Sequence, residues 1–356
     1  MSLSLYARYI GWSYFKAFWV IFGALELFYV GIDLLTNLKD LPSSANIQLL
    51  YLGLTALTAV SYVMPISLVF ALILTHINMV RSNELVSFYA LGISKNALIK
   101  PPFIIALMIT LIYIGLNCTP FAYAYDYQKN ISKSASFSKS TKDAFLKFDG
   151  KFIYIKELNA FEKSATDVRI FDTNATLLHS VITANSAKFK DDMWQLNDVN
   201  VTKLPKTLVL GGEGLLVQNF EHHKALSGFA PKSIESANAA QNANFSIPDT
   251  LGFIFTFKDE GVGLRSAKSV LYSLAIAPFF APFLMLILYY HLPVTGRFFN
   301  LAFSSFIFVL ITLIVWGVLF LLTRFSQNSV ILPELGIMLP VFLLIFYALY
   351  LLKSHR

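Results

Sequence analysis

Six long apolar stretches constrain this chain more than any other feature of its sequence. They cover residues 15–35, 50–79, 97–118, 270–292, 298–322 and 330–352. A helix needs about 20 predominantly apolar residues to cross the hydrocarbon core of a bilayer, and each stretch is long enough. The sequence therefore predicts six transmembrane helices. The second stretch exceeds a single crossing, so we expect that helix to tilt or to project beyond the bilayer.

The segment between the third and fourth stretches has the opposite character. Residues 119–269 hold 18 of the 28 Lys and Arg residues and 16 of the 21 Asp and Glu residues. This concentration of charge predicts a separate water-soluble domain. We therefore expect an N-terminal membrane half of residues 1–119 with three helices, a soluble domain of residues 120–266, and a C-terminal membrane half of residues 267–356 with three more.

The soluble domain has the alternating pattern of β-strands. Polar and apolar residues alternate over residues 151–158, 166–171, 193–201 and 207–210, and the turn signals Asp191-Asp192 and Gly211-Gly212 punctuate them. Several short strands with such turns favour an all-β domain of the β-sandwich or jelly-roll kind. Residues 237–244, rich in Ala, Asn and Gln, are expected to form a loop or linker.

The short loops predict the orientation, because Lys and Arg accumulate on the cytoplasmic side of a membrane protein. With the N-terminus inside, the cytoplasmic side holds Arg8, Lys16, Arg81, Lys95, Lys100, Arg297, Lys353 and Arg356, against Lys39 and Arg324 outside. We therefore expect both termini in the cytoplasm and the β-domain outside, which is the periplasm for a bacterial inner-membrane protein.

No pattern in the sequence predicts a catalytic or metal site. The chain has no G-x-x-x-x-G-K-[ST] phosphate-binding loop, so we do not expect it to hydrolyse ATP. His222 and His223 follow Glu221, but adjacent residues of a strand point to opposite faces and no further ligand lies at metal-site spacing. We interpret them as surface histidines.

Glu26 is the most unusual residue of the membrane part, because an ionisable group inside a transmembrane helix is costly and often functional. Two interpretations stay open. The carboxyl group is either kept protonated or turned to a polar cavity as a structural feature, or it belongs to a transport path. His76 is not expected to be its partner, since it belongs to the cytoplasmic half of the next helix.

Residues 81–92, in the loop between the second and third membrane stretches, predict a short amphipathic helix. The spacing of Leu85, Phe88, Tyr89 and Gly92 places them on one helical face. Glu84 supplies a first-turn carboxylate, and Gly92 is a typical helix stop. Such a helix would either lie on the membrane surface or dock into a cytoplasmic partner, and the pattern alone does not separate these alternatives.

Several segments resemble one family. Residues 84–94 are similar to the coupling-helix signature of the lipopolysaccharide export permeases, the LptF/LptG (YjgP/YjgQ) family, although Asn83 separates the usual Arg-Ser pair from Glu84. The start, Arg8-Tyr9-Ile10-Gly11, resembles the LptG branch in particular. So do residues 152–155, 187–189 and 194–196 of the outer domain, and Pro120 lies where these permeases leave the membrane. The resemblance covers the whole chain.

The resemblance implies a non-catalytic permease subunit of an ABC-type exporter that extracts lipopolysaccharide from the inner membrane of a Gram-negative cell. It implies an LptF-like second permease, an LptB-like ATPase dimer that binds ATP and Mg, and a periplasmic bridge of LptC- and LptA-like proteins. No cofactor is expected in this chain and no nucleic-acid partner. The residues that would couple it to the ATPase are Arg81, Glu84, Leu85, Phe88, Tyr89 and Gly92.

The resemblance also implies that the first helix forms a lateral gate with helices of the second permease. The residues assigned to the lipid path are Glu26, Asp33, Lys39 and Arg324. Family members tend to carry basic residues at the outer end of the first helix, where they meet lipid phosphates. This chain departs from that pattern, because it offers Lys39 with Asp33 and Asp40 nearby.

Two D-x-N-x-[ST] sequences lie in the outer domain, with acceptors at Asn174 and Asn200. They resemble the extended sequon of bacterial oligosaccharyltransferases and are candidate glycosylation sites. Chance is the alternative, because the domain is rich in Asn and Thr.

Three rival functions remain. A sensor or scaffold would bind a ligand with its β-domain but needs a cytoplasmic output domain, which we do not expect here. A membrane enzyme would need clustered catalytic residues. A permease for another envelope lipid or for lipoproteins is closer in class, but the lipoprotein-releasing type resembles four-helix chains.

Overall fold

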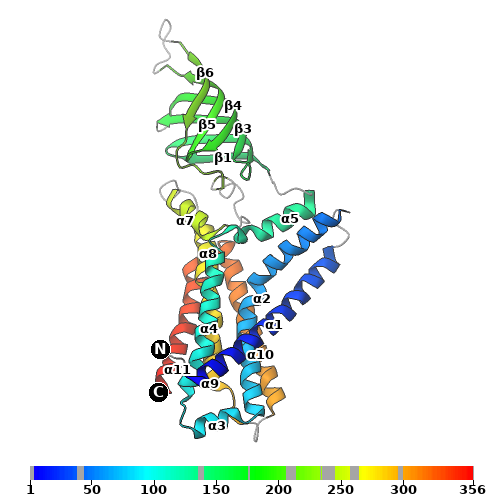
Figure 1. The fold of residues 1–356 in the computed structure, drawn as a ribbon. Coiled ribbons are helices and arrows are strands. Elements are labelled where there is room, and N and C mark those ends of the chain that lie inside the picture. The colour runs from blue at the N-terminus through cyan, green and yellow to red at the C-terminus, as the bar shows by residue number, and fades with distance from the viewer. Residues whose placement is uncertain are drawn as a thin grey trace. The chain divides into compact units, whose positions relative to one another are not determined.

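The computed structural model describes residues 4–37, 44–134, 140–174, 177–205, 214–232, 234, 245–256, 264–295 and 300–355. The chain divides into two compact units. One consists of Met1–Gln128 and Lys268–Arg356, and the other of Lys129–Ala267. The first unit is helical and contains the membrane part, and the second contains the β-sheet (Figure 1).

Six helical spans are long and apolar enough to cross a membrane, which confirms the prediction. They are α1 (Leu5–Asn37), α2 (Ala45–Arg81), α4 (Lys95–Leu116), α8 to α9 (Arg265–Ala275 and Phe280–His291, joined by η3, Ala277–Phe279), α10 (Leu301–Gln327), and the π-helix η4 (Glu334–Met338) continued by α11 (Leu339–Ser354). The short α3 (Glu84–Ala90) lies between α2 and α4, and η2 (Pro120–Tyr123) and α5 (Ala124–Ser134) follow α4.

The first two helices extend well beyond their apolar stretches. α1 begins ten residues before the predicted stretch, at Leu5, because no Pro interrupts the residues that precede it and the one glycine there, Gly11, is tolerated within the helix. α2 has 37 residues and so measures about 55 Å, nearly twice the hydrocarbon thickness. Pro65 removes one backbone donor inside α2, and Figure 1 shows that this helix changes direction along its length.

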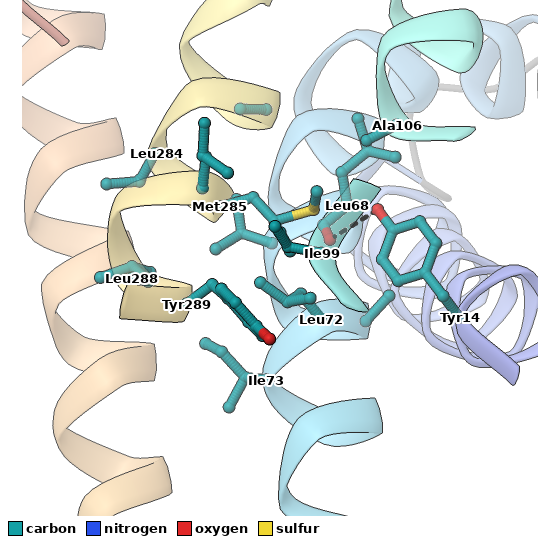
Figure 2. Packing of buried hydrophobic residues seen from close by; sticks show 14 of the residues in the cluster. Tyr14, Leu68, Leu72, Ile73, Ile99, Ala106, Leu284, Met285, Leu288 and Tyr289 are labelled. Atoms are coloured by element: carbon teal, nitrogen blue, oxygen red, sulfur yellow. Dashed lines mark hydrogen bonds between the residues drawn. The ribbon is translucent and has the colours of Figure 1, made fainter. Parts of the chain in front are cut away.

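The core of the helical unit lies around α2 and α9. In its most apolar stretch α2 is 61% buried by the rest of the chain, whereas α1 is 11% buried and α10 only 6%. The phenol of Tyr14 on α1 is fully buried and donates a hydrogen bond of 3.0 Å to the carbonyl of Leu68 on α2. Figure 2 shows this bond, with Met285 of α9 nearby. Hence α2 and α9 are central helices, while α1 and α10 leave most of their apolar surface uncovered.

The second unit contains one six-stranded antiparallel sheet in which each strand pairs with the next along the chain. The strands are β1 (Ser140–Phe148), β2 (Lys151–Asn159), β3 (Ser164–Asn174), β4 (Leu177–Lys190), β5 (Met193–Lys203) and β6 (Leu216–Ala225), and α7 (Ile247–Thr256) follows them. The predicted strands at 151–158, 166–171 and 193–201 lie within β2, β3 and β5. The predicted strand 207–210, the turn Gly211-Gly212 and the linker 237–244 lie outside the described residues. The two-layered sandwich or jelly roll stays a prediction.

Two-residue hairpins set the register of the sheet. Asp149 and Gly150 join β1 to β2, and Asp191 and Asp192 join β4 to β5, all four with positive φ. These left-handed conformations form the tight turns whose twist matches that of paired strands. One face of the sheet is buried, and there the indole Nε1 of Trp194 donates a hydrogen bond of 2.7 Å to the carbonyl of Phe229.

We predict that Gly336→Ala destabilises the helical unit, because η4 packs closely on α10 at this glycine. An added Cβ would contact Ser326 Oγ and would lie 2.7 Å from Ile331 Cδ1 and 3.1 Å from the backbone oxygen of Leu322. Such overpacking costs about 1–3 kcal/mol. The measurement is the melting temperature of the full-length chain in mild detergent, which should fall.

Gly317→Ala on α10 is the matched control, since nothing described lies within 4 Å of the Cβ it would add. Replacing a helical glycine by alanine in open space should leave the melting temperature unchanged or raise it. Equal melting temperatures for the two variants would show that η4 does not pack on α10 as described.

Candidate coupling helix and lipid path

α3 is a seven-residue helix with a defined start and end. Asn83 precedes it with φ 60°, a left-handed conformation that Asn tolerates better than most residues. At its end the N–H of Gly92 donates to the carbonyl of Tyr89, and the N–H of Ile93 donates to the carbonyl of Phe88, at 2.9 and 3.0 Å. With φ 77° at Gly92 this is a Schellman motif, which requires a left-handed residue at that position. The chain therefore fixes both ends of α3.

The apolar face of α3 points toward the chain's own core. Leu85 is 1% exposed, and Phe88 and Tyr89 are partly buried against the same hydrophobic cluster. Burial raises the pKa of the Tyr89 hydroxyl, which stays neutral at physiological pH. The free face of the segment instead carries Val86, 44% exposed, and Leu91, 76% exposed. Of the residues assigned to coupling, Leu85 therefore anchors α3, and the exposed apolar residues are ones that the sequence pattern did not single out.

Glu84 contacts the first transmembrane helix. Its Oε2 accepts a hydrogen bond of 3.1 Å from the hydroxyl of Tyr9 on α1. Arg81 is exposed in the last turn of α2. α3 is thus joined to α1 through Glu84, to the core through Leu85, and to α2 through only two intervening residues.

A hydrogen-bonded cluster joins α4 to α9 at the same end of the helical unit. The ammonium group of Lys95 donates to the carbonyl of Tyr290 at 2.9 Å and lies 5.6 Å from the ring centre of Tyr289. The hydroxyl of Tyr289 donates to the carbonyl of Lys95 at 3.0 Å. His76 of α2 lies beside this cluster, with its Nε2 2.9 Å from the carbonyl oxygen of Pro293. His76 therefore contacts the second membrane half of the chain.

Asn96 extends this cluster to the last helix. Its amide nitrogen donates to the carbonyl of Leu352 on α11 at 3.0 Å, and its amide oxygen accepts from the buried hydroxyl of Tyr290 at 2.5 Å. The sequence analysis did not predict this hydrogen-bonded cluster. Its only signal is a pair of polar residues, Lys95-Asn96, at the start of an apolar helix, and nothing in the sequence identifies their partners.

Asp33 is the centre of a second cluster at the opposite end of the helical unit. Its Oδ2 accepts hydrogen bonds from the hydroxyl of Tyr51 at 2.7 Å, the amide of Gln128 at 3.2 Å and the hydroxyl of Thr55 at 3.4 Å. Gln128 also donates to Thr55 at 2.9 Å. Asp33, which the resemblance assigned to the lipid path, therefore joins α1 to α2 and α5, a bonding role that the sequence did not predict.

The other residues assigned to the lipid path do not gather around Asp33. Glu26 is half-buried on α1, and its Oε2 has no hydrogen-bond partner among the described residues. The guanidinium group of Arg324 lies 5.1 Å from the ring centre of Phe320 and donates to Gln327, so these contacts stay within α10. Lys39 lies outside the described residues.

The candidate sites in the β-unit are surface features. Asn200 is exposed on β5, whereas the side chain of Asn174 lies outside the described residues. The Nδ1 atom of His222 lies 2.8 Å from the amide oxygen of Asn197, and His222 and His223 pair with different residues of β5. No group of three metal-binding side chains occurs in the described part of the chain. Glycosylation of Asn174 and Asn200 stays a prediction.

Six spans long and apolar enough to cross a membrane, an inserted antiparallel sheet and a short helix between the second and third spans define a polytopic membrane protein with an inserted β-domain. The sequence matches the family described as "Lipopolysaccharide export system permease LptF/LptG" over residues 8–354. The chain belongs to this family of non-catalytic transport subunits and is an inner-membrane protein. A comparison with curated proteins gave no match.

We predict that Asp33→Ala loosens the end of α1, because its carboxylate accepts four hydrogen bonds, of which the three from Tyr51, Thr55 and Gln128 come from α2 and α5. The net loss is about 1–3 kcal/mol of local stability at roughly 1 kcal/mol per bond. Tyr51→Phe removes one donor and should have a smaller effect. Hydrogen–deuterium exchange of peptides covering residues 28–37 in the full-length protein is the measurement, and exchange should become faster.

Thr36→Val is the control for this experiment, because within the described part of the chain the Thr36 hydroxyl bonds only to carbonyls of its own helix, those of Ile32 and Asp33. Exchange in Asp33→Ala that is no faster than in Thr36→Val would mean that the cluster does not hold α1.

Proposed function

We propose that this chain is the permease subunit, of the LptG branch, of an ABC-type exporter that extracts lipopolysaccharide from the inner membrane and passes it to a periplasmic bridge. An LptF-like permease completes the membrane part, and an LptB-like ATPase dimer supplies the energy with its own ATP and Mg. Both termini are cytoplasmic and the β-domain is periplasmic. The observation that carries this proposal is α3, a closed short helix held between two membrane spans of a chain in the LptF/LptG family.

The exposed face of α3 supports docking to a cytoplasmic ATPase. Val86 and Leu91 are large apolar side chains that the chain itself leaves uncovered. They extend from a helix whose other face is fixed by the buried Leu85. An exposed apolar group on a rigid support is suited to insertion into a groove of a partner.

The burial of the helices supports a lateral gate built with a second permease. α1 and α10 are the least buried spans in their apolar stretches. Their outward side chains are large and apolar, among them Leu27 and Phe28 on α1 and Phe303 and Phe306 on α10. Such surfaces suit lipid acyl chains and another membrane helix equally, which is what a gate between two permeases requires.

The last strand of the sheet supports attachment of a periplasmic bridge. Among the described strands β6 pairs only with β5. It carries the exposed apolar residues Leu216, Val217 and Phe220. An apolar edge strand can accept a further strand from another protein, and main-chain hydrogen bonds then extend the sheet across the junction.

We predict that Leu91→Asp and Val86→Asp abolish co-purification of the ATPase with the tagged chain. A carboxylate in an apolar groove would be buried without a partner, and binding should fall by more than tenfold. The measurement is mass spectrometry of the proteins that co-purify in mild detergent. Val330→Asp is the control, because Val330 is 69% exposed in the turn after α10, at the opposite end of the helical unit from α3.

Glu84→Ala and Tyr9→Phe separate two roles of the coupling helix. If Glu84 contacts the ATPase, Glu84→Ala loses the ATPase while Tyr9→Phe keeps it. If Glu84 acts by holding α3 to α1, both variants lose it to a similar extent. An ATPase that is absent from the wild-type preparation would remove the energy source and contradict the exporter.

Cys118 provides a test of the proposed orientation. It is the single cysteine of the chain and is exposed just after α4, at the end opposite α3. In intact spheroplasts a membrane-impermeant maleimide should label it. In a Cys118→Ser background, Leu91→Cys should be labelled only after permeabilisation. The reverse pattern would place the β-domain in the cytoplasm and contradict the orientation.

A further inference from the structure

A pocket of about 400 Å³ lies between the beginning of α1 and the end of α2. The polar residues that line it are Tyr9, Trp12, Ser13, Lys16, Thr75 and Asn78. Lys16 supplies a positive charge, and none of the described residues that line the pocket is acidic. The volume is in the range of pockets that bind small molecules or parts of larger ones.

Thr75 lines this pocket and carries a hydroxyl group without a described partner. The residue is 3% exposed, and its Oγ1 has no hydrogen-bond partner among the described residues. Buried hydroxyls elsewhere in the spans donate to the carbonyl four residues earlier, as Thr58 does on the same helix and Thr110 does on α4, both at 2.9 Å. A buried polar atom without a partner is costly, so an unsatisfied hydroxyl that lines a pocket indicates a ligand that accepts its hydrogen bond.

The position of the pocket near one end of two membrane spans suits the depth of lipid headgroups. Its residues belong to the first five turns of α1 and the last three turns of α2, at the end of the helical unit that carries α3. Trp12 is exposed there, and tryptophan is enriched at the membrane–water boundary. The ammonium group of Lys16 lies 5.4 Å from the Trp12 ring centre, so the charge is held beside the pocket.

We propose that this pocket binds the phosphodiester headgroup of an anionic phospholipid from the leaflet on the α3 side of the membrane. Lys16 pairs with the phosphate charge, and the hydroxyls of Thr75 and Ser13 donate to its oxygens. The apolar side chains of Val20 and Leu74 complete the lining and contact the beginning of the acyl chains. A basic pocket between transmembrane helices at this depth is typical of sites for acidic lipids.

Binding of this phospholipid does not depend on the proposed export function. Tyr9 is not counted among the donors because its hydroxyl is bonded to Glu84. Through that bond, one wall of the pocket is joined to α3. A lipid bound here therefore contacts the residue that connects α1 to the coupling helix.

The test is native mass spectrometry of the delipidated full-length chain titrated with phosphatidylglycerol or phosphatidylcholine. Wild type should bind phosphatidylglycerol about tenfold more tightly. Lys16→Gln should lose about tenfold in affinity for it, because a charge-assisted bond to the phosphate is removed. Thr75→Val, which keeps the shape of the side chain, should lose about threefold. Lys16→Gln replaces an exposed side chain and keeps the test valid if Thr75→Val fails to fold.

Two matched variants control for charge and for threonine. Lys100→Gln removes an exposed cation from α4, and Thr58→Val removes a hydroxyl that is satisfied within α2. Both should bind phosphatidylglycerol as wild type does. Equal binding of the two lipids by wild type, or unchanged binding by Lys16→Gln, would overturn the proposal.

Two further arms distinguish other occupants of the pocket. Millimolar inorganic phosphate should leave bound phosphatidylglycerol in place, and displacement would assign the pocket to a free anion instead of a lipid. The chain purified together with its second permease should retain the site. Loss of phosphatidylglycerol binding in that complex would mean that the partner fills the pocket.

Discussion

The scarcity of hydrogen-bond partners inside a membrane is the constraint on which this structure depends. Without water, polar groups in the spans bond either to their own helix or to a neighbouring one. Most hydroxyls bond to their own helix, as Thr58, Ser67 and Thr312 do with carbonyls one turn earlier. Only a few groups bond across helices. Those few determine which helices are fixed together, since apolar contacts between helices are not directional.

The bonds between helices concentrate at two ends of the helical unit. At one end Asp33 joins α1, α2 and α5, all from the first part of the chain. At the other end Lys95 and Asn96 join α4 to α9 and α11, which connects the two membrane halves. Between these two ends, the described hydrogen bond that joins α1 to α2 is that of Tyr14, in the first third of α1. A helix fixed mainly near its ends and largely uncovered elsewhere is suited to lateral movement against a partner.

The membrane spans and three of the six strands could be predicted from the sequence because they depend on local pattern, whereas β1, β4 and β6 were not predicted. Apolar length predicted the six spans, alternation predicted β2, β3 and β5, and Asp191-Asp192 marked a hairpin. The clusters could not be predicted in this way. Asn96 and Tyr290 are 194 residues apart, and neither has a local feature that identifies the other.

The segment around α3 shows a subtler limit of sequence reasoning. An apolar face at helical spacing predicts burial, but it does not say whether the chain itself or a partner covers that face. The structure places Leu85 in the chain's own core, so the exposed apolar residues are Val86 and Leu91. Only the tertiary structure could separate the two faces, because both carry apolar residues.

The fixed position of α3 has a mechanical consequence for the proposed exporter. A coupling element that was tethered loosely would absorb a displacement in its own loops. α3 cannot do so easily, because Leu85 is buried, the Schellman motif closes its end, and Glu84 is bonded to α1. A push from an ATPase on α3 must then move α1, α2 and α4 with it. Lys95 and Asn96 bond the beginning of α4 to α9 and α11, so the same displacement reaches the second membrane half without passing through the lipid-facing surface.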